Sequence, residues 1–87
     1  MKRTERTAVA EYGRTMCFNN GPQTLDQCIR EARIFASSHA RAARYWFAYG
    51  RRTSDLHSLF LGLFERRCAR DWREALYRLE KVRDLAL

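Results

Sequence analysis

The residue types best suited to catalysis stand close together at Asp55, His57 and Ser58. A serine nucleophile needs a base that meets it in space and an oxyanion site beside it. Three neighbours on one predicted helix do not supply that arrangement. The chain also has no glycine-rich phosphate loop. We therefore expect no catalytic residues and a protein that is not an enzyme.

The candidate metal ligands are Cys28, His39 and Cys68. Cys28 and His39 are about 16 Å apart along one predicted helix, whereas zinc binds its ligands at about 2.0–2.3 Å. The three cysteines of the chain are an odd number without C-x-x-C spacing, which argues against a disulfide framework. We expect no metal site, no cofactor and a reducing, cytoplasmic compartment. No signal peptide and no apolar run of about 20 residues is present, so no membrane contact is expected.

Arginine chemistry is the strongest functional signal. The 87 residues carry a net charge of +7, and only Lys2 and Lys81 of the 17 basic residues are lysine. A GC-rich genome also favours arginine, but it does not explain why residues 32–54 hold five arginines and no acid. Guanidinium groups pair with phosphate or carboxylate and stack on aromatic rings. This pattern predicts nucleic acid or an acidic protein surface as the partner.

The segment "RYWFAYGRR", residues 44–52, places aromatic rings among these arginines. At 100° per residue, Trp46 and Phe47 continue an apolar helix stripe, Tyr45 lies on the opposite face, and Tyr49 lies at the boundary. The alternative is that Ile34 and Tyr45 pack under the N-terminal helix. The predicted binding surface consists of Arg33, Arg41, Arg44, Tyr45, Tyr49, Arg51 and Arg52.

Two functions fit such a surface. The first is a small nucleic-acid-binding regulator, in which arginines hold phosphates and a tyrosine stacks on an unpaired base. The alternative is an adaptor or inhibitor, of the kind that phages and plasmids carry, which docks on an acidic or nucleic-acid-binding surface of a larger complex. A helix-turn-helix is unsupported, because the segments on both sides of Gly50 are too long.

A long helix is predicted over residues 25–49. Thr24 and Gln27 fit a capping box, and apolar residues recur every 3.6 positions from Leu25 to Phe47. Gly50 is placed where a left-handed C-terminal cap would end the helix.

A second helical region follows the capping residues Thr53 and Ser54, with Asp55 in its first turn. We expect helices over residues 55–69 and 71–86 that meet near Arg70, with one continuous helix as the alternative. A weaker pattern predicts a short helix over residues 5–16.

The expected fold class is all-α, as a single domain over residues 1–87. The short N-terminal helix packs on a long antiparallel helical hairpin, which gives a bundle of three or four helices, because the connection after Gly50 is too short for any other path. The run "LFLGLF" has more apolar faces than one neighbouring helix can cover. A homodimer through Leu59, Phe60, Leu63 and Phe64 would cover the remainder.

Overall fold

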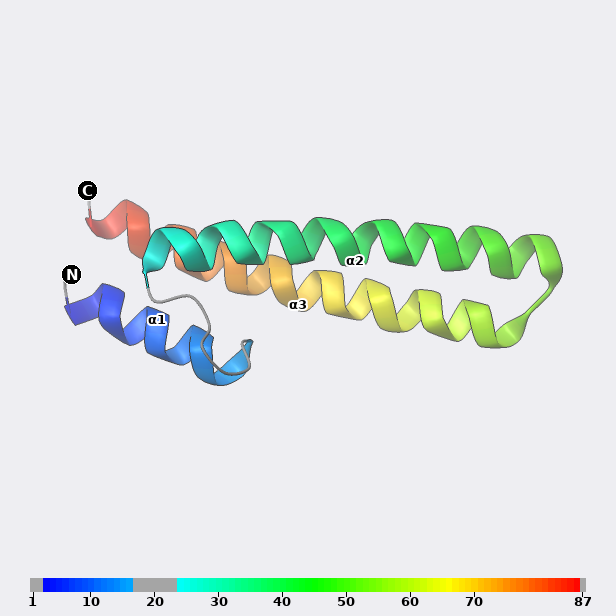
Figure 1. Cartoon of the computed structure of the whole chain (residues 1–87), viewed down its shortest axis with the longest axis horizontal. Helices are drawn as coiled ribbons and strands as arrows, with labels where there is room; N and C mark the ends of the chain where they lie inside the picture. The colour runs from blue at the N-terminus through cyan, green and yellow to red at the C-terminus, as the bar shows by residue number, and fades with distance from the viewer. Residues whose placement is uncertain (1–2, 17–23, 87) are drawn as a thin grey trace.

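The computed structural model describes residues 3–16 and 24–86, which form α1 (Arg3–Thr15), α2 (Leu25–Thr53) and α3 (Leu56–Ala86). The last two run antiparallel as a hairpin in a molecule of 51 × 25 × 13 Å, and α1 lies beside only one half of it (Figure 1). The described residues contain no strand. The predicted all-α bundle, with a short helix on a long hairpin, is therefore confirmed. None of the three described helices combines the length and hydropathy needed to cross a membrane.

The start of α2 follows the predicted capping box. The Thr24 hydroxyl accepts a hydrogen bond from the Gln27 N–H at 3.2 Å, and the Gln27 side chain accepts one from the Thr24 N–H at 3.1 Å. Two backbone donors that have no partner inside the helix are thereby satisfied.

The predicted end of α2 at Tyr49 is wrong, because the helix continues through Gly50 to Thr53. The left-handed cap is Ser54, with φ of 56°. Gly50 is buried instead against α3, where an added Cβ would lie 2.7 Å from Cδ2 and 3.1 Å from the backbone nitrogen of Leu59. A small residue at Gly50 therefore lets two helices approach each other.

The third helix begins at Leu56 and is continuous through Arg70, as in the second of the two sequence alternatives. Its N-terminal cap is Asp55, one position later than expected. The Asp55 carboxylate accepts hydrogen bonds from the His57 N–H at 3.1 Å and from the Ser58 hydroxyl at 2.7 Å. No glycine or proline follows within the helix after Gly62, so nothing in the backbone favours a break.

The core lies in the half of the hairpin beside α1. We call this half, residues 25–40 and 71–86, the open half. Its buried residues come from all three helices: Tyr12, Leu25, Cys28, Ile29, Ala32 and Leu79. Tyr12 is only 3% exposed. Its hydroxyl donates to Glu31 at 2.7 Å, and its ring meets Trp72 edge-on at 6.1 Å. Tyr12 thus attaches α1 to both hairpin helices.

The other half, residues 41–70, is the tip half. Between its two helices runs a seam of small buried residues that starts at Ala36 of the open half and continues through Ala43, Gly50, Ser58, Gly62 and Ala69. Small side chains let the helices approach closely, so bulky residues must lie beside the seam. Trp46 and Phe47, which the sequence placed on the core stripe, are half-buried. By helix phase they lie on opposite sides of the seam, and the Phe47 ring covers Gly62.

Candidate binding surface

Four predicted site residues form one row on the outer side of α2, and all of them except the half-buried Tyr49 are exposed. Tyr45 is 60% exposed, and its ring stacks on Tyr49 with centroids 6.3 Å apart. The Arg52 guanidinium lies over the Tyr49 ring at 5.7 Å. Arg41, also exposed, precedes Tyr45 by one turn. We call Arg41, Tyr45, Tyr49 and Arg52 the tyrosine–arginine ridge.

Trp46 supports the ridge, and sequence analysis missed this role of Trp46. Its ring meets Tyr45 edge-on at 5.1 Å and Tyr49 edge-on at 6.2 Å. Edge-on aromatic pairs add about 0.5–1.5 kcal/mol beyond simple burial, so the tyrosines are held in place before any ligand arrives. Helix phase alone assigned Trp46 to the core; the small residues Ala43 and Gly50 were the sign that the core position was already taken.

The remaining predicted arginines lie elsewhere. Arg33 belongs to the open half, where it forms an ion pair with Glu80 at 3.3 Å. Arg44 and Arg51 are exposed and share the side of α2 that bears Phe47. On that side Arg66 of α3 places its guanidinium 5.9 Å from the Phe47 ring centre. The structure therefore divides the predicted surface into the ridge and a second arginine row, and it separates Arg33 from both.

The alternative in which Ile34 and Tyr45 pack under the N-terminal helix is wrong. Both side chains are 60% exposed. The reason is the position of α1, which contacts α2 on the side of Glu31 and Cys28, through Tyr12.

Charge is concentrated in the tip half. Residues 41–70 contain seven arginines and two acids, a net charge of +5, whereas the other described residues hold nine bases and eight acids. The seven are Arg41, Arg44, Arg51, Arg52, Arg66, Arg67 and Arg70. None of them forms an ion pair with a residue that the structure describes.

Both acids of the tip half have partners inside the molecule. Glu65 hydrogen-bonds His39 across the two helices at 2.5 Å. Asp55 caps α3, and the hydrogen bond from the Ser58 hydroxyl is the largest cause that lowers the pKa of Asp55, with backbone N–H groups adding to it. Neither carboxylate neutralises an arginine, so the tip half presents free guanidinium groups to the solvent.

The side chains considered for catalysis and metal binding have structural surroundings that do not suit either role. The Ser58 hydroxyl is buried and donates to Asp55, not to His57. Burial raises the pKa of the Cys28 thiol and is also the largest cause that raises the pKa of Cys68. A raised pKa keeps a thiol protonated and weakens it as a nucleophile. Within the described ranges, no three His, Cys, Asp or Glu side chains are placed to hold a metal ion.

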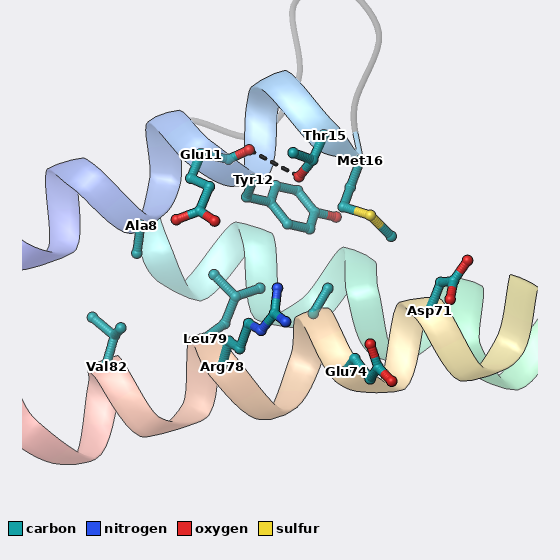
Figure 2. A pocket seen from close by; sticks show the side chains of 11 residues that line it. Ala8, Glu11, Tyr12, Thr15, Met16, Asp71, Glu74, Arg78, Leu79 and Val82 are labelled. Atoms are coloured by element: carbon teal, nitrogen blue, oxygen red, sulfur yellow. Dashed lines mark hydrogen bonds between the residues drawn. The ribbon is translucent and has the colours of Figure 1, made fainter.

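A pocket of about 300 Å³ lies between α1 and α3 in the open half. Figure 2 shows its two walls, with Glu11 on α1 and Asp71, Glu74 and Arg78 on α3. Tyr12 and other apolar side chains form its interior surface. The rim carries both signs of charge, and the pocket is separate from the ridge.

No protein-family model, curated protein or solved structure matches this chain. Its function is therefore inferred from its own side chains.

Proposed function

We propose that this protein binds nucleic acid through the tip half. The observation that carries the proposal is the set of seven arginines of the tip half without a carboxylate partner, two of which, Arg41 and Arg52, lie on the ridge with the exposed Tyr45 ring. Free guanidinium groups attract phosphates, and the counterions released on binding supply much of the affinity.

The ridge favours a single strand with unpaired bases. A base that stacks on tyrosine contributes roughly 1–3 kcal/mol without a strict sequence preference. Tyr45 offers most of its ring to solvent, and Tyr49 and Trp46 hold it in position. Arg41 and Arg52 lie at the two ends of the ridge, about 16 Å apart along the helix. They can hold the backbone on both sides of a stacked base.

The test is fluorescence anisotropy with labelled single-stranded and duplex oligonucleotides, at salt concentrations from about 50 to 200 mM. We expect tighter binding of single strands and a log–log salt slope of several units. The double variant Arg41→Gln/Arg52→Gln should lower the slope by about 1.4, because each lost phosphate contact removes about 0.7 for a single strand.

The matched control is Arg6→Gln/Arg14→Gln, which removes the same charge from two exposed positions of α1. It should leave the slope nearly unchanged. An absence of oligonucleotide binding at 50 mM salt would contradict the proposal.

One observation favours the adaptor function as a second candidate. Leu56 and Phe60 near the start of α3 are 70% and 66% exposed. Nucleic acid offers an aliphatic side chain such as Leu56 little to bind, whereas a protein partner covers both residues readily. A pull-down with nuclease treatment separates the two candidates. A stoichiometric protein partner that survives nuclease and is lost in Arg44→Glu or Tyr45→Ala would favour the adaptor, of the kind that phages and plasmids carry.

The cytoplasmic location and the self-association expected from the sequence also belong to the proposal. Burial of Cys28 suits a compartment in which thiols stay reduced. Phe60, Leu63 and Phe64 are exposed, as a homodimer surface requires, while Leu59 lies over Gly50. Leu59 is therefore left out of the proposed contact.

A further inference from the structure

One side of the hairpin is covered along only half of its length. In Figure 1, α1 lies beside the open half, and the tip half extends beyond it as two helices alone. The 13 residues of α1 span about 20 Å, whereas the 29 residues of α2 span about 43 Å. At least about 23 Å of the same side therefore has no third helix.

The uncovered positions of α3 correspond to those that face α1. Residues separated by seven positions lie within about 20° of each other around a helix. Ala75 and Asp71 line the pocket beside α1. Two such steps from Ala75 lead to Leu61, and one step from Asp71 leads to Phe64. Leu61 is half-buried, and Phe64 is 61% exposed.

The same relation holds on α2. Ala32 belongs to the buried cluster that α1 covers, and Phe35 stacks on Trp72, which Tyr12 of α1 contacts. Two seven-residue steps from Ala32 lead to Trp46, and two from Phe35 lead to Tyr49. The surface that α1 covers in the open half thus continues into the tip half, where no third helix covers it. We call Trp46, Phe60, Leu61 and Phe64 the tip face, with Tyr49 at its border with the ridge.

The tip face is nearly free of the charge that surrounds it. By helix phase, Arg41 and Arg52 lie on the outer side of α2, and Arg44, Arg51 and Arg66 lie on the opposite side of the hairpin. Arg67, one turn from Phe64, lies at the border of the tip face. Two tip faces can therefore meet while the two ridges remain directed to solvent.

We propose that two copies of this chain associate through their tip faces in antiparallel orientation. A parallel pair would place the two α1 helices against each other, since both lie on the side that forms the contact. In the antiparallel pair, each tip half covers the 23 Å that the other copy leaves open. Phe60 and Phe64 of both copies then lie at the centre of four helices.

The amount of apolar surface agrees with a dimer. A fully covered phenylalanine buries about 150–250 Å², so the four rings of a pair bury on the order of 500 Å² from their exposed state. Leu61, Trp46 and the stems of neighbouring long side chains add to this. The four rings alone therefore supply less than half of the roughly 1,200 Å² at the lower limit of stable interfaces, and the remainder must come from these neighbouring side chains.

The test is the molar mass in solution, measured by sedimentation equilibrium on nuclease-treated protein up to about 200 µM. We expect the wild-type chain to reach twice the monomer mass. Phe64→Glu should be monomeric over the same range and retain its helical circular dichroism, because the residue is exposed within each copy.

The matched control is Tyr77→Glu, which places the same charge on an aromatic position of α3 that is 62% exposed but lies outside the tip face. It should remain dimeric, and Phe60→Glu should behave as Phe64→Glu. A wild-type chain that is monomeric at all concentrations would overturn the dimer and leave the tip face to a different protein. A dimer that both Phe64→Glu and Tyr77→Glu leave intact would overturn the tip face as its contact.

The tip-face contact and its antiparallel orientation specify the self-association proposed above, and they are measured without any oligonucleotide. Failure of one proposal is therefore distinguishable from failure of the other: loss of oligonucleotide binding leaves the molar mass unchanged, and a monomeric wild type can still show a steep salt slope.

Discussion

At the residue scale, two glycines of this chain have opposite roles although both lie within helices. Gly50 faces α3, and an added Cβ would meet both the side chain and the backbone of Leu59 at 2.7–3.1 Å. For Gly13 in α1, no atom of a described residue beyond its chain neighbours and the backbone of its own helix turn lies within 4 Å of the same position. The difference is one of space, since neither glycine has a positive φ.

Gly50→Ala should therefore destabilise the protein and Gly13→Ala should stabilise it. Overpacking costs typically 1–3 kcal/mol, which exceeds the gain of about 1 kcal/mol from replacing a helical glycine. We expect a net loss of up to about 2 kcal/mol for Gly50→Ala and a gain of about 0.5–1 kcal/mol for Gly13→Ala. Urea unfolding followed by circular dichroism measures both. Equal stability of the two variants would show that the seam is not tightly packed.

Sequence analysis predicted the residues whose signal is local and missed those whose role depends on a neighbour. Thr24 and Gln27 cap each other within one turn, so their spacing was sufficient. Gly50 fits either a left-handed cap or a close helix contact, and only the position of Leu59 decides between them. Tyr45 was correctly placed outward by helix phase, whereas the support from Trp46 depends on a seam that the sequence did not reveal.

At the element scale, the start of α3 depends on one carboxylate. Asp55 accepts hydrogen bonds from the backbone of His57 and from the hydroxyl of Ser58, and its pKa is lowered chiefly by the Ser58 bond. A lowered pKa in the folded state means that folding favours the charged form. The contribution is therefore present above the unfolded pKa of about 4 and is lost as pH falls through the lower folded-state pKa.

Asp55→Asn should remove this part of the acid sensitivity. The amide oxygen still accepts the His57 N–H, but it no longer titrates. We expect the wild type to lose stability below pH about 4 more steeply than the variant, as measured by thermal unfolding at a series of pH values. Asp84→Asn is the control, because Asp84 is exposed and forms no hydrogen bond with another described residue. Identical pH profiles for wild type and Asp55→Asn would contradict this role of the cap.

The elements themselves were largely predictable, and their ends were not. The apolar repeat of α2 extends over most of its 29 residues, so its existence follows from the pattern. The end of α2 depends on whether Gly50 acts as a left-handed cap or as a close helix contact. The continuity of α3 past Arg70 was an open alternative, because Asp71 and Glu74 resemble a new helix cap in the sequence. In the continuous helix, the Trp72 ring stacks on Phe35 of α2.

At the scale of the whole molecule, charge and apolar surface are separated within the same tip half. Of the arginines without carboxylate partners, Arg41 and Arg52 occupy the outer side of α2, and Arg44, Arg51 and Arg66 occupy the side bearing Phe47. The tip face occupies the side that continues from α1, with Arg67 at its border. Sequence analysis found the acid-free stretch of α2. It did not find Arg66, because only the folded hairpin brings that residue beside Phe47.

This separation predicts how affinity depends on oligonucleotide length. If two copies pair through their tip faces, one dimer carries two ridges, and a strand that reaches both gains from the high effective concentration of the second site. A single strand of about 40 nucleotides should then bind wild type at least about tenfold more tightly than one of about 8, after correction for the number of starting positions.

Phe64→Glu should lose this gain for the long strand and keep most of its affinity for the short one, because the ridge of each copy stays intact. Arg41→Gln/Arg52→Gln should weaken both lengths by a similar factor, since it removes phosphate contacts from every ridge. Anisotropy titrations of the two lengths with the three proteins measure these effects. If Phe64→Glu and wild type showed the same ratio between long and short strands, the two ridges would be acting independently, and the dimer would have no part in binding.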